Sequence, residues 1–325
     1  MKKIFFLLPE GFTRLSSILL ATDGFEFANQ YMMSRDGKPY YDIKIVGNNI
    51  SQNLCNSHIS IKVENISNVE RPDLIIIPAA AAENNYASRK NKKLLSWVVD
   101  QYKEGTELAS LCTGSFLLAA TGLFKNMECA THWMAANLFT KMFPNVTLCT
   151  DKIITDSKGL YTAGGALSSS NLILYLIEKY NGRDVAIYCA KVMHLNIDRN
   201  SQSAFIIFEG QKDHVDVDIK KMQIFIEENA DEKITIDYLA DKFFMPKRSL
   251  VRRFKKATNN TPIEYIQRIK MEVAKRNLES GRKSVSEIMY EVGYADTKAF
   301  RNIFKKIAGI SPIEYRRKYN RDFAE

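Results

Sequence analysis

The stretch FKKATNNTPIEYIQR, residues 254–268, returns as FKKIAGISPIEYRRK, residues 304–318, so the chain carries one pattern twice at an offset of fifty residues. Upstream the offset falls to forty-nine, since Leu239 matches Ile288, so one residue is inserted within the turn. Two copies are too few to bury the core of a solenoid, and each copy holds two helical stretches separated by a short turn. The duplication therefore predicts two helix-turn-helix units.

The first copy begins with TIDYLADKF, residues 235–243, in which Thr235 is a capping candidate and apolar residues recur at helical spacing. After a turn, KRSLVRRFKK, residues 247–256, places Leu250 and Phe254 on one side for the core, and six of its ten residues are basic. Such a face suits a groove lined by phosphates. A solvated surface is the alternative for one copy taken alone, and the repetition favours nucleic acid.

The second copy repeats this plan with different residues in the turn. VSEIMYEVGY, residues 285–294, supplies the supporting helix, and Gly293 is able to take the left-handed conformation that a tight turn needs. DTKAFRNIFKK, residues 296–306, follows as the second basic helix and opens on Asp296 as its N-cap. Each copy thus ends in a helix suited to a DNA groove.

Residues 218–320 resemble the AraC-type DNA-binding domain, in which seven helices hold two helix-turn-helix motifs joined by a long helix. The joining helix here would be PIEYIQRIKMEVAKRNLES, residues 262–280, with Gly281 placed to end it. Two positions depart from the family pattern. Pro246 stands where a Ser often caps the first recognition helix, a loss of about 1 kcal/mol, and Met289 stands where a small residue is common.

The resemblance implies that the first half of each recognition helix contacts base edges and that flanking basic residues hold phosphates. The base-contact candidates are Arg248, Val251 and Arg252 in the first helix and Thr297, Lys298, Arg301 and Asn302 in the second. The phosphate candidates are Lys247, Lys255, Lys256, Lys305 and Lys306. Arg reads guanine through two hydrogen bonds, and Asn prefers adenine. We expect double-stranded DNA at promoter sites as the partner, with the two helices about 34 Å apart. RNA polymerase is a further candidate partner.

The distribution of charge agrees with this division. The chain has 46 Lys and Arg against 37 Asp and Glu. From residue 215 onward there are 24 basic and 17 acidic residues, which leaves 22 and 20 for the rest. The basic excess therefore belongs to the predicted DNA-binding part.

The N-terminal segment and the cysteines also indicate the cellular compartment. The opening MKKIFFLLPEGF, residues 1–12, has too short an apolar run for a signal peptide, and no run approaches a membrane span. Five Cys, an odd number without a C-x-x-C pair, indicate free thiols in a reducing compartment. We expect a cytoplasmic protein with no metal site and no cofactor.

The first 196 residues are of a different kind, because short apolar runs alternate with helical stretches. The runs are KKIFFLLP, YDIKIVG, DLIIIP and TELASLC. This alternation predicts a doubly wound α/β domain over residues 1–196, with a mostly parallel sheet covered on both faces. Residues 197–217 form the expected linker. Its apolar segment AFIIF, residues 204–208, is either a core strand or a stretch that docks on one domain, and its polar flanks favour docking.

Within the α/β part, ELASLCTGSFLLAATGLF places Cys112 where a strand turns sharply into a helix. Backbone N–H groups at the helix start would lower the pKa of the thiol. This elbow, with ATHW at residues 130–133 and YTAGG at residues 161–165, resembles the class I glutamine amidotransferase-like fold in its PfpI-related branch. The pairing of such a domain with an AraC-type tail resembles the GlxA family of transcriptional regulators.

Catalysis would need a base for the thiol and donors for an oxyanion. His132 is the only plausible base, and Thr113 follows the Cys where catalytic relatives commonly have a His. Ser16 replaces their acidic residue, and Ala79 and Ala80 replace their paired Gly. We therefore expect no enzyme, with Cys112 and His132 as vestigial candidates. In the structural alternative, Cys112 is a small residue that fits the elbow and His132 is a polar side chain whose hydrogen bonds are satisfied.

Three classes of function remain open. The favoured one is a transcription factor whose first domain binds a small-molecule effector and forms a homodimer. In the second, that domain is an assembly module only. In the third, it is a thiol-dependent hydrolase or amidase tethered to DNA. The effector pocket candidates are Ser16, Ala80, Cys112, Thr113 and His132.

Overall fold

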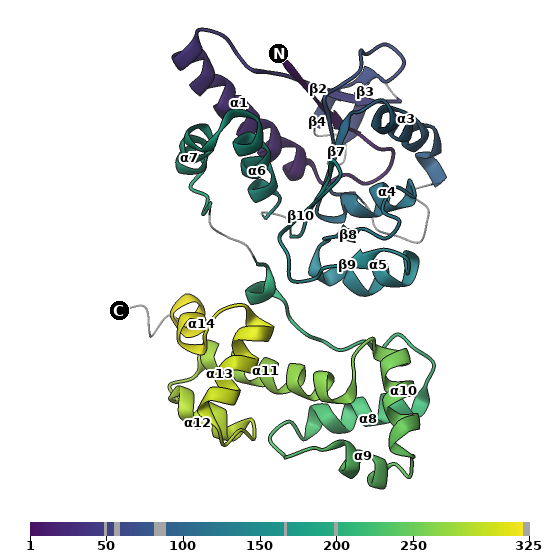
Figure 1. Cartoon of the computed structure of the whole chain (residues 1–325), viewed down its shortest axis with the longest axis vertical. Coiled ribbons are helices and arrows are strands. Elements are labelled where there is room, and N and C mark those ends of the chain that lie inside the picture. Colours follow the sequence, from purple (N-terminus) through teal and green to yellow (C-terminus); the bar gives the residue numbers. More distant parts are fainter. Residues whose placement is uncertain (49–50, 55–58, 81–88, 166–167, 198–200, 321–325) are drawn as a thin grey trace. The chain divides into compact units, whose positions relative to one another are not determined.

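The computed structural model describes all residues except 49–50, 55–58, 81–88, 166–167, 198–200 and 321–325 (Figure 1). The chain divides into two compact units, Met1–Gln202 and Ser203–Glu325. The division lies inside the expected linker, whose residues 198–200 lie outside the described residues. None of the described helices is both long and apolar enough to cross a membrane.

The first unit is built on a seven-stranded sheet with the order β10-β11-β7-β6-β1-β2-β5. Its strands are β1 Lys2–Leu7, β2 Tyr41–Gly47, β5 Glu64–Asn65, β6 Leu74–Ile77, β7 Glu107–Leu111, β10 Ile154–Ser157 and β11 Leu160–Ala163. Neighbours pair in parallel except β10 and β11. Two small sheets pair β3 Ser51–Leu54 with β4 Ile59–Lys62 and β8 Glu128–Cys129 with β9 Thr147–Leu148. The predicted α/β fold with a mostly parallel sheet is confirmed.

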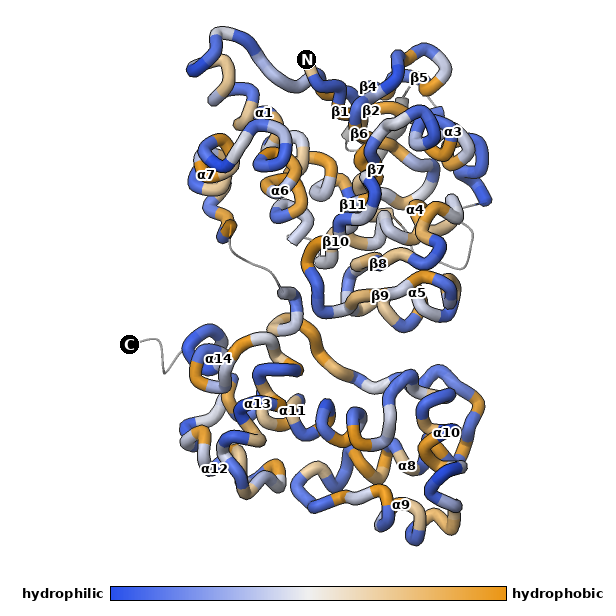
Figure 2. Tube along the Cα trace, viewed as in Figure 1, coloured by the Kyte–Doolittle hydropathy of each residue, from blue (hydrophilic) through white to orange (hydrophobic). Residues whose placement is uncertain are grey.

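Both faces of the large sheet are covered by helices, because the central strand β6 is apolar at every position and its neighbour β1 is apolar from Ile4 to Leu7. In β1, Ile4 and Phe6 join one core and Phe5 and Leu7 the other. The helices of the first core are α1 Leu15–Asp36, α6 Ser169–Asn181 and α7 Arg183–Val192. Those of the second are α3 Lys92–Lys103, α4 Ser115–Ala120 and α5 Ala136–Met142. Figure 2 shows hydrophobic residues in β6, at the centre of these layers.

The second unit contains seven α-helices among its described residues. They are α8 Val217–Glu228, α9 Ile236–Lys242, α10 Lys247–Thr258, α11 Pro262–Ser280, α12 Val285–Glu291, α13 Thr297–Ala308 and α14 Pro312–Tyr319. The predicted joining helix and α11 have the same bounds. Two cores form along α11: Tyr265 and Ile269 belong to the first motif's core, and Met271 and Leu278 to the second's. Helix α11 is therefore the shared support of both motifs.

Most predicted helix boundaries are confirmed by their hydrogen bonds. The Thr235 side chain accepts from the backbone N–H of the third residue after it, and Asp296 does the same at the start of α13. Pro246 begins α10 without a side-chain hydrogen bond, as its chemistry requires. Gly293 has φ of 74°, in the left-handed region.

Residues 203–216, which we call the strap, pack on the helical unit. A short 3₁₀ turn, Ser203–Phe205, opens the strap, and Ala204 is buried. The ring of Phe208 packs edge-to-face on Tyr265 with centroids 5.2 Å apart. The strap forms no strand, so the core-strand alternative is wrong, and the expected docking of the apolar segment is confirmed.

Candidate nucleic-acid interface and effector pocket

The first recognition helix, α10, is held by its apolar side. Leu250 and Phe254 are fully buried in the first core, whereas Arg248 and Arg252 are exposed on the opposite side. The turn before α10 contains Phe244, which has φ of 48° and is 95% exposed. Burial of one stripe thus presents the basic stripe to solvent.

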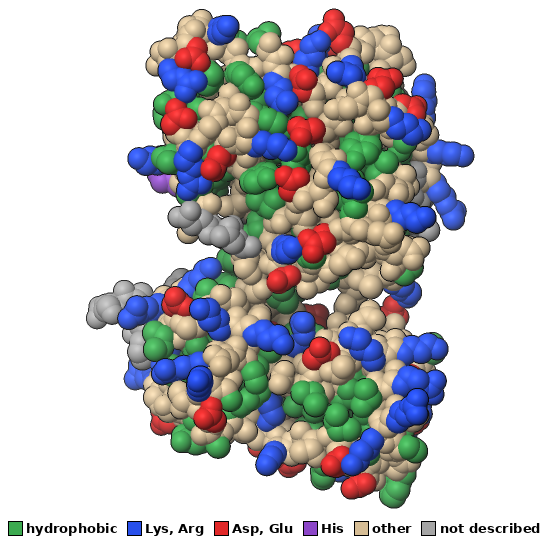
Figure 3. Space-filling model, in the orientation of Figure 1, with side chains coloured by type: hydrophobic (Ala, Val, Ile, Leu, Met, Phe, Trp, Pro, Cys, Tyr) green, Lys and Arg blue, Asp and Glu red, His purple; other side chains and the backbone are tan. Residues whose placement is uncertain are grey.

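The second recognition helix, α13, repeats this arrangement. Phe300 and Phe304 are fully buried in the second core, and Arg301 and Asn302 are exposed. Of all the predicted DNA-contact residues, only Val251 is half-buried, and the others are exposed. In Figure 3, Lys and Arg side chains gather over the part of the helical unit where α10 lies.

In the α/β unit, the elbow at Cys112 adopts the sharp geometry that the sequence indicates. Cys112 follows β7 directly with φ of 55° and is buried. Gly114 packs so closely that a Cβ there would lie 2.5 Å from the carbonyl oxygen of Pro78. The hydroxyl of Thr113 donates to the Ala80 carbonyl over 2.6 Å, which joins two of the pocket candidates.

The predicted effect of the elbow on the thiol is wrong in sign. Burial raises the pKa of Cys112, and the opposing hydrogen bond from the Thr113 backbone and the charge of Arg14 do not outweigh it. The helix start is a 3₁₀ turn, Cys112–Gly114, inside an apolar core, so desolvation of a thiolate dominates. At neutral pH the group is a thiol.

His132 is engaged by its own backbone. Its Nδ1 accepts from the Met134 N–H over 3.2 Å at the start of a 3₁₀ turn, and its ring stacks on Trp133. Burial, and then the charge of Arg14, lower the pKa of the imidazole. Within the described residues no hydrogen bond joins His132 to Cys112. This geometry agrees with a satisfied polar side chain.

Two family models match the chain. The helix-turn-helix domain model covers residues 239–318, and the DJ-1/PfpI family model covers residues 18–179. The chain is 24% identical to the HTH-type transcriptional regulator GbdR of Pseudomonas aeruginosa, over 97% of this chain and 84% of the relative. It is 23% identical to the regulator GlxA of Rhizobium meliloti, over 98% of this chain and 96% of the relative. The chain is similar along its whole length to the GlxA-type regulators of the AraC family.

Solved structures agree on the fold over about three fifths of the chain. An AraC family transcriptional regulator from Pseudomonas putida matches with a TM-score of 0.50 and 16% identity, over 59% of this chain and 100% of that chain. A ThiJ/PfpI family protein from Pseudomonas syringae matches with a TM-score of 0.50 and 15% identity, over 61% and 76%. The regulator thus pairs an α/β domain of DJ-1/PfpI type with a DNA-binding helix-turn-helix domain.

Some basic residues near α10 of the regulator already have carboxylate partners. Lys247 pairs with Asp237 over 2.5 Å, and both side chains are well exposed, so phosphate can compete for the lysine. Arg253 instead holds Asp216 over 2.6 Å and Asp218 over 2.9 Å, at the start of α8. Arg253 therefore fastens α10 to α8 and the strap, and the sequence pattern does not separate it from its DNA-facing neighbours.

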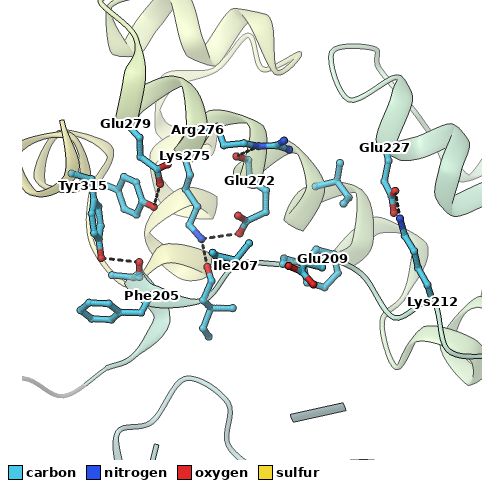
Figure 4. A pocket seen from close by; sticks show the side chains of 15 residues that line it. Phe205, Ile207, Glu209, Lys212, Glu227, Glu272, Lys275, Arg276, Glu279 and Tyr315 are labelled. Carbon is cyan, nitrogen blue, oxygen red and sulfur yellow. Dashed lines mark hydrogen bonds and ion pairs between the residues drawn. The ribbon is translucent and has the colours of Figure 1, made fainter. Parts of the chain in front are cut away.

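The strap encloses a pocket of about 750 Å³ against α11 (Figure 4). At its floor Lys275 and Glu272 form a buried ion pair of 2.7 Å. Lys275 Nζ donates to the Ile206 carbonyl over 2.5 Å, and the Phe208 N–H donates to Glu272, whose pKa burial raises. The pair thus holds the strap by its backbone. Sequence reasoning missed it because a Glu and a Lys three residues apart on a helix are usually solvated.

Ser16 and its neighbours are placed differently from the sequence expectation. Ser16 is exposed, whereas the Ser17 hydroxyl is buried and accepts from the Ala79 N–H over 3.1 Å. The preceding loop brings the charge of Arg14 within electrostatic reach of the thiol and the imidazole. The backbone of Thr13 forms an isolated β-bridge with Ala80, and its hydroxyl is buried without a hydrogen-bond partner among the described residues. The sequence offered no periodic signal for either loop residue.

Proposed function

We propose that α10 and α13 enter two successive major-groove segments of double-stranded promoter DNA. The observation that carries the proposal is the matched exposure of both helices on one shared support, α11. Arg248, Arg252, Arg301 and Asn302 contact bases in this account, with the three other predicted base-contact residues. The Lys residues near the helix ends hold phosphates, so they supply affinity and not sequence preference.

We propose that the α/β unit is a sensor without catalytic activity, and that its effector is a small anion. A neutral thiol and an engaged imidazole argue against a nucleophile and base pair. The charge of Arg14 beside both groups, with the unpaired hydroxyl of Thr13, suits a carboxylate. Ala80, Cys112, Thr113 and His132 would complete the pocket, with Ser16 at its exposed side.

Thermal unfolding of the full chain tests the sensor. The probes are small carboxylic acids, each paired with its neutral amide. At a hundred times its dissociation constant an effector adds about 2.7 kcal/mol, which raises the unfolding midpoint of a unit of this size by roughly 5–11 °C. We expect a carboxylate to do so, Arg14→Gln to abolish the shift, and Cys112→Ser to keep it. Product formation that Cys112→Ser abolishes would instead establish a thiol hydrolase or amidase. A silent panel with intact DNA regulation favours an assembly module.

We further propose that the strap carries the effector signal to α11 and that the regulator acts as a homodimer. The buried Glu272–Lys275 pair supports transmission through the strap, since it links the strap backbone to the helix shared by both motifs. Chymotrypsin cleavage at Phe208 should change when effector binds, and identical cleavage contradicts the coupling.

Exposed apolar side chains on the packed helices α1 and α7, such as Leu19 and Ile187, support the homodimer. Sedimentation of the full chain tests the dimer, which could present its tails to RNA polymerase.

A further inference from the structure

Lys270 is a buried charge at the middle of α11, and each of its three N–H donors has a backbone acceptor. Nζ donates to the carbonyls of Ala230 and Glu232, each over 2.8 Å, and to the carbonyl of Val292 over 2.7 Å. Lys270 as a whole residue is only 6% exposed. Ala230 and Glu232 lie between α8 and α9 of the first motif, and Val292 ends α12 of the second. One ammonium group therefore joins the two motifs.

The repeat supplies an internal comparison for this lysine. At the offset that matches Pro262 with Pro312, Lys270 matches Asn320. Asn320 is also buried, and its Nδ2 donates to the carbonyls of Leu278 and Gly281 over 3.0 and 3.1 Å. Both carbonyls lie where α11 ends, before the supporting helix of the same copy. Each copy thus ties itself together at this position, and the bond from Lys270 to Val292 is the additional, inter-motif one.

The two motifs touch closely at the same point. A Cβ built on Gly293 would lie 2.7 Å from the Asp231 carbonyl oxygen and 2.8 Å from Lys270 Nζ. The turn of the second motif therefore lies directly against the segment that enters α9 of the first. A contact between two backbones, held by a charge-assisted donor, leaves little freedom for one motif to move against the other.

We propose that Lys270 is a positioning residue for DNA recognition, which sets the separation of α10 and α13 so that both enter their groove segments together. The proposal rests on the proposed two-segment DNA contact. Its consequence is a strict spacing requirement: each half of the site should bind in the absence of Lys270, but the gain from having both halves at the right distance should shrink.

The test uses the full chain with Lys270→Met, which keeps the volume and removes the donors, and Asn320→Ala as the matched control. Sites selected by the wild-type chain from random DNA are prepared whole, with one half scrambled, and with one or two base pairs inserted between the halves. For Lys270→Met we expect unchanged half-site affinity and a whole-site affinity reduced about tenfold, the effect of losing the single inter-motif hydrogen bond from the ammonium group. Inserting base pairs between the halves should reduce the affinity of Lys270→Met less than it reduces the affinity of the wild-type chain.

Asn320→Ala should lower the unfolding temperature and keep the wild-type ratio of whole-site to half-site affinity. An unchanged ratio and spacing profile in Lys270→Met overturns the proposal, as does an equal loss on half and whole sites. If Lys270→Met does not fold, Lys270→Asn carries the test, because the second copy folds with Asn at this position. A wild-type chain that binds half and whole sites equally overturns the two-segment contact itself and the role of Lys270 with it.

Discussion

The two helix-turn-helix copies share their interiors and differ at their edges. Phe254 meets Tyr265 edge-to-face at 5.3 Å, and Phe304 meets Tyr315 in the same way at 5.5 Å. The turns contrast: Phe244 extends into solvent in a left-handed conformation that strains a bulky residue, whereas Gly293 is pressed against the first motif. The comparison teaches that the repeated residues build each core and that the unmatched ones decide how the two motifs fit together.

The helix starts differ in the same sense. Helix α13 begins with the Asp296 cap, and α10 begins with Pro246, which has no side-chain acceptor. Further along the same two helices, Arg253, which is tied to carboxylates, corresponds to Ile303, which packs on the second core. The first motif is thus the more polar and electrostatically fastened, and the second depends on packing and a cap.

Substitutions at the two turns should give the largest difference in the free energy of unfolding. Gly293→Ala places a Cβ in the left-handed region against a backbone carbonyl, and we expect a loss of roughly 2–3 kcal/mol in the free energy of unfolding. Phe244→Gly is the matched change. It relieves strain in the folded state and adds backbone entropy to the unfolded state, so we expect the free energy of unfolding to change by less than about 1 kcal/mol in either direction. Urea unfolding measures both. Similar values for the two turns would contradict the comparison.

Substitutions on the two exposed faces should separate the readout of bases from the contact with phosphate. Arg252→Ala should cost about 1–3 kcal/mol on the selected site and much less on random DNA. Lys306→Ala should weaken both alike and reduce the slope of log K against log salt by about 1. Titrations at several salt concentrations measure these effects. Equal losses for Arg252→Ala on both DNAs would reduce that residue to a phosphate contact.

The caps offer a reciprocal pair of smaller changes. Asp296→Ala removes the acceptor at the start of α13 and should cost about 1 kcal/mol. Pro246→Ser supplies an acceptor that α10 lacks and should gain up to about 1 kcal/mol, reduced by the loss of proline's preset backbone. Thermal unfolding of the two variants decides the matter. No response at Asp296 would show that packing alone holds the second helix.

Acid should weaken the tie between Arg253 and Asp216 in the first motif, a tie that the second motif lacks because Ile303 stands at the position of Arg253. The Arg253 hydrogen bond holds the pKa of Asp216 below its ordinary value. A lowered folded-state pKa contributes stability above the unfolded pKa, about 3.9, and this contribution is lost as the pH falls through the folded pKa. Because the pair is partly exposed, we expect at most about 0.5 kcal/mol. Asp216→Asn should remove the difference in midpoint between pH 5 and pH 3 that this pair causes, and an unchanged difference contradicts the tie.

Local pattern was sufficient for the helices of the two motifs and for the strands β1, β2, β6 and β7. The bounds of α11, the caps at Thr235 and Asp296, and the left-handed turn at Gly293 follow from spacing and backbone chemistry. Long-range burial was not predictable in this way. On an amphipathic helix Lys270 reads as a solvated residue, and only the fold brings three carbonyls from two motifs around it. The predicted lowering of the Cys112 pKa was wrong for the same reason, since desolvation depends on neighbours distant in sequence.

The central claim is that α10 and α13 read two major-groove segments one helical turn apart. Methylation interference at guanine N7 on a selected site tests it most directly, because N7 lies in the major groove. We predict two clusters of interference on one face of the duplex, with centres about 10 base pairs apart, the one lost in Arg252→Ala and the other in Arg301→Ala. A single cluster, or two clusters on opposite faces, would contradict the account.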